Sequence, residues 1–175
     1  MADAPQEPTY ESVAREFAAP LQRLAIGYEA DAERQRDLLQ EMHLALWRAL
    51  PSFEGRASLR TFVHRVAHNV AVGYVIRSSR DQLSRCVPLE EMEERAAHFD
   101  GRQIERRDEV ERLAMLVRSL RPNDRQIILL YLEGFGHAEI GEVCGISPEN
   151  AATKVHRIKR ALAAALEPGD GHGQR

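Results

Sequence analysis

The side chains whose types and spacing most clearly indicate a binding surface lie in residues 148–166. Positions 151, 155, 158, 162 and 166 are apolar, at intervals of four, three, four and four, and this spacing predicts a helix with one buried face. The other side of that helix carries polar and basic residues: Asn150, Thr153, Lys154, His156, Arg157, Lys159 and Arg160. Such groups bond to phosphates and base edges, so the helix is predicted to enter the major groove of DNA.

A shorter helix is predicted just before it, over residues 137–144. Gly145 stands where that helix must end in a left-handed turn, a conformation that glycine tolerates. Ser147 and Pro148 then supply a cap and a first-turn proline for the longer helix. Residues 137–162 therefore predict a helix-turn-helix, although an amphipathic hairpin with a solvated charged face would show the same pattern.

Two histidines one helical turn apart, His64 and His68, form a possible metal-ligating pair. The helical zinc motif of metalloproteases needs a glutamate after the first histidine, but Arg65 stands there and no third ligand is indicated. We interpret the pair instead as part of a polar helix face able to meet phosphates and bases, formed by Arg60, His64, Arg65, His68 and Asn69.

No pattern in the sequence indicates catalysis. There is no nucleophile elbow, phosphate loop or dinucleotide-binding glycine pattern. We therefore expect no catalytic residue, no metal and no cofactor, and a protein that is not an enzyme.

The charges divide the chain into parts. The 175 residues carry a net charge of −3, yet residues 56–80 hold five arginines and no acid, and residues 154–160 hold four basic residues and no acid. Residues 87–111 hold nine acids and four arginines, a local charge of −5. Two basic helices separated by an acidic stretch indicate two nucleic-acid contacts joined by a linker.

Strand signals are scarce, and helical periodicity dominates. We predict an all-α fold of two small helical domains, residues 9–80 and 111–166, joined by a flexible acidic linker over residues 81–110. The predicted helices cover residues 10–18, a segment from Pro20, and residues 31–50, 58–80, 105–119 and 123–132, followed by the helix-turn-helix.

The two cysteines, Cys86 and Cys144, form no CxxC pair, so neither a disulfide framework nor a zinc module is indicated. We expect Cys144 to act as a small apolar residue in the helix-turn-helix core; a redox role for either cysteine stays open. Neither a membrane-spanning apolar run nor a signal peptide is apparent, so we expect a cytoplasmic protein without membrane insertion.

One further helix face is unusual. Asp37, Gln40, Glu41 and Leu44 share a side of the helix over residues 31–50, which places a leucine among polar groups. A solvated face with one stray leucine would look the same. The functional interpretation is a docking face for another protein.

Two stretches in this order resemble a known family: DLLQEMHLALWRALPSFEGRASLRTFVHRVAHNVA and LRPNDRQIILLYLEGFGHAEIGEVCGISPENAATKVHRIKRAL. They resemble the bacterial extracytoplasmic-function (ECF) sigma factors, and the resemblance covers about residues 10–166. It implies an initiation factor that directs RNA polymerase core to promoters and assists strand opening. The implied partners are the β′ clamp and β flap of the polymerase and promoter DNA, and an anti-sigma factor is an open possibility.

The resemblance also implies roles for residues. The segment DLLQE, with Asp37, Gln40, Glu41 and Leu44, would grip the β′ clamp. The helix at 148–166 would read the −35 element. The loop over residues 51–58 and the helix after it would capture a flipped base of the −10 element, using Phe53, Gly55, Arg56, Arg60, His64, Arg65, His68 and Asn69.

Four residues depart from the family pattern. Phe62 and His64 replace a frequent tryptophan and tyrosine, Ala152 replaces a frequent basic residue, and Gly141 replaces the usual alanine. Phe62 is on the apolar stripe, so we expect it in the core. The alternative function is a stand-alone helix-turn-helix regulator that binds DNA as a dimer; the face around Glu41 argues against it, because a regulator has no need of a docking face there.

Overall fold

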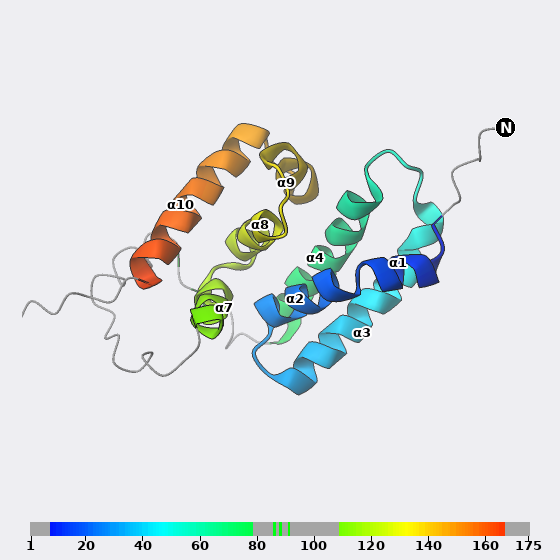
Figure 1. Cartoon of the computed structure of the whole chain (residues 1–175), viewed down its shortest axis with the longest axis horizontal. Helices are drawn as coiled ribbons and strands as arrows, with labels where there is room; N and C mark the ends of the chain where they lie inside the picture. Colours follow the sequence, from blue (N-terminus) through cyan, green and yellow to red (C-terminus); the bar gives the residue numbers. More distant parts are fainter. Residues whose placement is uncertain (1–7, 79–85, 87, 89–90, 92–108, 167–175) are drawn as a thin grey trace, which may run out of the picture.

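The structure, a computed structural model, describes residues 8–78, 86, 88, 91 and 109–166. Eight α-helices and one 3-10 turn make up the regular structure of these residues. In Figure 1 they form two groups, one coloured blue to green and the other light green to red. This arrangement confirms the predicted fold of two small helical domains, the second with a helix-turn-helix.

Four helices and a short turn form the first bundle: α1 (Tyr10–Glu16), α2 (Ala18–Tyr28), α3 (Ala32–Ala49), η1 (Leu50–Ser52) and α4 (Leu59–Ser78). Asp31 begins α3, where its carboxylate accepts hydrogen bonds from the backbone N–H groups of Glu33 and Arg34, donors that have no partner within the helix. The inward apolar faces supply the core, including Leu21, Leu24, Leu38, Met42, Leu46, Val63 and Ala67.

Four more helices form the second bundle: α7 (Glu109–Ser119), α8 (Pro122–Leu132), α9 (His137–Cys144) and α10 (Pro148–Leu166). The predicted turn between α9 and α10 is present, with Gly145 in the left-handed region at φ 69°. The core contains the apolar stripe predicted for α10, together with Leu120, Leu130 and Ile140. Cys144 packs against this core, as predicted.

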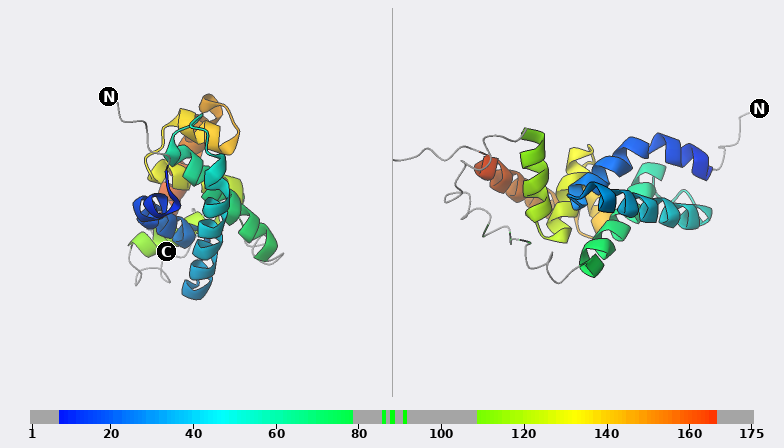
Figure 2. Two further views of the ribbon diagram at one scale, coloured as in Figure 1. Left: turned by 90° about the vertical axis from the view of Figure 1, so that its right-hand side faces the viewer. Right: turned by 90° about the horizontal axis from the view of Figure 1, so that it is seen from below.

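The two bundles pack against each other. Helices α2 and α4 of the first contact α7, α8 and α9 of the second, and the right-hand view of Figure 2 shows the groups side by side. Leu129 of α8 lies against Gly27 of α2 so closely that a Cβ at Gly27 would be 2.7 Å from its Cδ2. The guanidinium of Arg118 also donates to the carbonyl of Ile26 at 2.9 Å.

The structure refines several predicted helix boundaries. The first helix ends at Glu16 rather than at residue 18, and α2 begins at Ala18 rather than at Pro20. Residues 50–52, predicted partly as loop, form η1, and α8 begins at Pro122 rather than one residue later. Proline is tolerated in a first helical turn because its missing N–H would have no partner there. Most of the predicted linker at 81–110, including the predicted helical residues 105–108, lies outside the described residues.

No helix in the described parts of the chain has the length and apolar character needed to span a bilayer.

Gly141 is required by the tight turn of the helix-turn-helix. A Cβ at this position would lie 2.6 Å from the backbone oxygen of Ile146, and the Ile146 N–H donates to the Gly141 carbonyl at 3.0 Å. The turn therefore approaches α9 where a side chain would stand, which accounts for the departure from alanine.

We predict that Gly141→Ala lowers the free energy of unfolding by roughly 1–2 kcal/mol, because overpacking outweighs the better helix propensity of alanine. Urea unfolding of the full chain measures this. Gly73→Ala in α4 is the matched control, since its Cβ would meet only the end of the Arg77 side chain, at 3.1 Å. Equal stability of the two variants would contradict this account of the turn.

Candidate nucleic-acid interface

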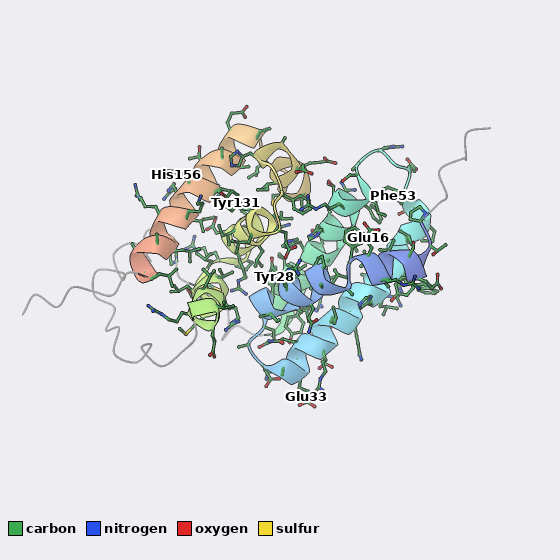
Figure 3. The ribbon with its side chains drawn as sticks, viewed as in Figure 1. Glu16, Tyr28, Glu33, Phe53, Tyr131 and His156 are labelled. Carbon is green, nitrogen blue, oxygen red and sulfur yellow. The ribbon has the colours of Figure 1, made fainter. Side chains whose placement is uncertain are left out.

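The outer face of α10 is open. Six of its seven predicted DNA-binding residues are exposed, and Figure 3 shows His156 on the outer side of the helix: Asn150, Thr153, His156, Arg157, Lys159 and Arg160. The apolar side of α10 is buried in the second bundle. The helix thus presents its polar side chains on a rigid support, as a major-groove reader must.

Two lysines of α10 have partners within the bundle. Lys154 is half-buried, and its Nζ lies 2.9 Å from Asp124 Oδ1 on α8. The Nζ of Lys159 donates to the Tyr131 hydroxyl at 3.0 Å and lies 4.8 Å from the centre of that ring. Lys154 is therefore less available for a phosphate than the sequence suggested, whereas Lys159 stays exposed beside an aromatic ring.

A cavity of about 360 Å³ lies between the loop after η1 and the start of α4. Its lining is Ser52, Phe53, Glu54, Arg56, Ala57, Phe62, Arg65 and Glu142. The rings of Phe53 and Phe62 are 5.1 Å apart, and Phe62 is buried as predicted. Gly55 has a φ of 71°, a conformation that favours glycine and turns the loop back toward α4.

The prediction that His64 and His68 lie on an open polar face of α4 is wrong. Both side chains are buried, with His64 2% exposed and His68 0% exposed. Tyr28 places its hydroxyl 3.2 Å from Nδ1 of His68 inside the first bundle. The His64 ring is 4.7 Å from that of Phe135 in the second bundle. His68 is buried by its own bundle, and the contact of His64 with Phe135 depends on packing between the two bundles, so neither lies open to DNA.

The other members of that face differ in exposure. Arg65 is half-buried at the cavity, and Asn69 is exposed. Arg60 is half-buried because its guanidinium lies 4.0 Å from the centre of the Phe135 ring and donates to the Glu133 carbonyl. The open part of the predicted −10 surface is therefore the loop, Arg56, Arg65 and Asn69.

Burial sets the charge state of the two histidines. Desolvation lowers the pKa of His64 to about 4, although the negative charge of Glu133 opposes this shift. The pKa of His68 falls to about 3, chiefly by desolvation and also by repulsion from His64. Both are neutral at pH 7. No cluster of three or more metal-ligating side chains occurs among the described residues.

The predicted docking face on α3 is exposed: Asp37, Gln40, Glu41 and Leu44 are all open to solvent. Glu41 pairs with Arg77 of α4 at 2.7 Å, which links this face to α4. Sequence reasoning missed Trp47, which is 58% exposed, more than Leu44 at 46%. Its position three residues after Leu44 places it on the same side of the helix and could have identified it.

The cysteines differ in environment. Burial raises the pKa of the Cys144 thiol to about 11, so it stays protonated and unreactive. Cys86 accepts a hydrogen bond from the buried guanidinium of Arg125, at 3.6 Å.

The family comparisons agree with this geometry. Residues 13–81 match the family Sigma-70 region 2, and residues 110–162 match the family Sigma-70, region 4. A similar protein is the ECF RNA polymerase sigma factor SigC of Mycobacterium tuberculosis, 29% identical over 147 residues, which are 83% of this chain and 77% of that protein. Another is the RNA polymerase sigma factor YlaC of Bacillus subtilis, 23% identical over 131 residues, 74% of this chain and 76% of that protein.

Two solved structures share the fold. CnrH in complex with the cytosolic domain of CnrY has a TM-score of 0.64 and 18% identity, covering 90% of this chain and 86% of that one. The sigma factor RpoE in complex with the anti-sigma factor NepR from Bartonella quintana has a TM-score of 0.61 and 17% identity, covering 89% and 97%.

The exposed polar side of α10 in one bundle and the loop-lined cavity in the other have the form expected of a promoter-recognition protein with two DNA-contacting parts. With both sigma-70 regions matched in order, the chain belongs to the ECF family of RNA polymerase sigma factors.

The buried histidines predict acid sensitivity. Above pH 6.5 the histidines are neutral in both the folded and unfolded states. As the pH falls below 6.5, both histidines become protonated in the unfolded chain. In the folded chain they stay neutral until the pH approaches their lowered pKa values, about 4 for His64 and about 3 for His68. The free energy of unfolding should therefore fall by about 1.4 kcal/mol per pH unit for each histidine.

Urea unfolding between pH 6 and 5, where an unfolded histidine is mostly protonated, measures this slope. His64→Gln should remove about one proton from it, whereas Asn69→Gln, at an exposed and non-titrating position of the same helix, should leave it unchanged. A slope that His64→Gln does not alter would contradict the neutral, buried state of that ring.

Proposed function

We propose that this sigma factor works by dividing promoter recognition between its two bundles while α3 holds the polymerase. The outer face of α10 reads the −35 element, and the cavity after η1 takes an unpaired −10 base. The face with Asp37, Gln40, Glu41 and Leu44 binds the β′ clamp, with Trp47 beside it. The observation that carries this proposal is that one chain holds an exposed recognition helix, a cavity fit for a base and a separate docking face.

The cavity supports the −10 assignment chemically. Its volume of about 360 Å³ lies within the usual range of about 300–1,000 Å³ for small-molecule sites. Phe53 and Phe62 form an aromatic wall, while Arg56 and Arg65 supply cations for the neighbouring phosphates. Aromatic rings with nearby cations are the usual means of holding single-stranded nucleic acid.

The chain assists strand opening by binding, not by catalysis. Flipping one base out of a duplex costs a few kcal/mol. A site that accepts the flipped base and not the paired one offsets this cost by differential affinity, while the polymerase supplies the remaining contacts. The work takes place in the cytoplasm, and the alternative of a stand-alone dimeric regulator is not favoured, because such a regulator needs no polymerase-binding region.

The proposal is tested by transcription from a library of templates randomised at the −35 and −10 positions. Core polymerase with the purified chain should yield transcripts enriched for one sequence at each element. Core polymerase alone is the control. Transcripts with no enrichment over that control would refute the proposed function.

Polymerase docking predicts the effect of changing α3. The pair of substitutions Glu41→Lys and Leu44→Arg should weaken binding to core polymerase by at least about 30-fold, the effect of losing an interface hot spot of about 2 kcal/mol. Leu132→Arg on α8 is the matched control, because Leu132 is 53% exposed and lies outside the docking face. Binding by fluorescence anisotropy, with circular dichroism to verify folding, measures both; unchanged affinity in a folded variant would contradict the docking role.

The recognition helix predicts a contrast between two substitutions. Arg157→Ala should relax preference at one or two −35 base pairs by about 1–3 kcal/mol, because arginine bonds a guanine edge in two places. Lys159→Ala should weaken all sequences alike and reduce the salt dependence, as a phosphate contact does. The template library gives both results. Identical −35 preferences with and without Arg157 would show that it does not read bases.

A further inference from the structure

We propose that Cys86 is a site of oxidative modification, at which Arg125 of α8 binds the anionic oxygen that a hydroperoxide places on the Cys86 sulfur. The site lies outside the residues proposed to bind DNA or the polymerase, so it is a property of the chain beyond promoter recognition. Its chemistry follows from a buried cation that has an unused hydrogen-bond donor next to a sulfur atom.

Arg125 is held away from water without a carboxylate beside it. It is 3% exposed, and its guanidinium lies 5.3 Å from the centre of the Tyr28 ring. In the described parts of the chain it donates to carbonyl oxygens and to the sulfur of Cys86. Burial lowers the pKa of Arg125, and the negative charges that Cys86 and Tyr28 can carry oppose this shift. A cation in such a place is stabilised by an anion next to it.

One edge of the Arg125 guanidinium is only half used. Its Nη2 donates to two carbonyls of the second bundle and to Cys86 Sγ at 3.6 Å. The neighbouring Nε is buried and has no hydrogen-bond partner among the described residues. Arg23 uses the same edge, Nε with Nη2, to hold the two oxygens of Glu133 at 2.6 and 2.7 Å. The Arg125 edge offers an oxyanion the same fork, and the adjacent atom that can acquire oxygen is the Cys86 sulfur.

The two cysteines differ in their readiness for this chemistry. Cys86 is partly exposed and lies against a cation, the setting in which thiols react with oxidants. Cys144 packs against the apolar core of the second bundle, and burial raises the pKa of its thiol to about 11. A hydroperoxide should therefore oxidise Cys86 and spare Cys144, which makes Cys144 a control within the same chain.

The reaction is a two-electron oxidation of sulfur. The Cys86 thiolate attacks one peroxide oxygen, the O–O bond breaks as the S–O bond forms, and the proton on the attacked oxygen passes to the leaving alkoxide or hydroxide. The thiolate becomes a sulfenate, and the hydroperoxide is reduced to an alcohol or to water. Thiols reverse this first step, whereas they do not reverse further oxidation to the sulfinate.

Hydrogen peroxide tests the site in the full chain, folded in buffer and unfolded in urea. A cyclic diketone traps sulfenic acid, and peptide mass analysis measures the trapped product at each cysteine. In the folded chain, trapping at Cys86 should exceed trapping at Cys144 by at least about tenfold. In urea the two should be trapped alike, because unfolding removes both the cation and the burial. Equal trapping in the folded chain, or none at Cys86, would overturn the inference.

The part played by Arg125 is tested with a permanent carboxylate at position 86. Aspartate presents two oxygens, as a sulfinate does, and asparagine has the same shape without the charge. Cys86→Asp should have a Tm at least about 3 °C above that of Cys86→Asn, because its carboxylate binds the Nε and Nη2 edge. An added carboxylate with no cation partner would have the opposite effect in a chain of net charge −3.

A third substitution separates the fork from the charge. Arg125→Lys keeps a cation but lacks the paired donors, so in that background the Tm difference between Cys86→Asp and Cys86→Asn should fall by at least about half. An undiminished difference would show that the Arg125 fork does not hold the oxygens. Should Arg125→Lys fail to fold, the comparison in the original background decides: a Cys86→Asp chain no more stable than Cys86→Asn refutes the role of Arg125.

Discussion

The packing of Phe135 between Arg60 and His64 is the interaction on which the arrangement of this molecule depends. This contact joins the turn between α8 and α9 of the second bundle to α4 of the first bundle. Helix α4 carries part of the predicted −10 surface. The ion pair between Arg23 and Glu133 also links the two bundles. The Arg23 side chain is 57% exposed and the Glu133 side chain 17%, so salt screens their attraction. The pair therefore orients the contact between the bundles more than it stabilises it. The apolar part, Phe135 and Leu129 against α4 and α2, excludes water from the rest.

The two proposed DNA-binding surfaces have different physical requirements. A duplex reader needs a polar helix held from behind, and α10 meets this with a buried apolar side and an open polar one. A single-strand site needs a recess with aromatic and cationic walls, which the Phe53–Phe62 pair and two arginines provide. The second bundle contributes Glu142 to the lining of the recess, whereas the outer face of α10 remains exposed.

The features that depend on residues close together in the sequence could mostly be predicted from that sequence. The left-handed Gly145, the apolar spacing of α10, the exposed side of α3 with Glu41 and the buried Phe62 could all be predicted, since each depends on residues within a few helical turns. Trp47 carried the same kind of signal, at helical spacing from Leu44. The −35 and docking residues stay predictions, supported by the exposure of all of them except Lys154.

What the sequence by itself determined is the set of helices, their buried sides and the family to which the chain belongs. Only the tertiary structure decided that His64 and His68 are buried, that Lys154 pairs with Asp124 and that Glu142 reaches the cavity. Helical periodicity reports which side of a helix is apolar, but not which polar residues a second bundle will cover. Glu142 lies some 80 positions after Arg65 in the chain, and contacts over such separations arise from the packing of the bundles, which spacing along one helix cannot encode.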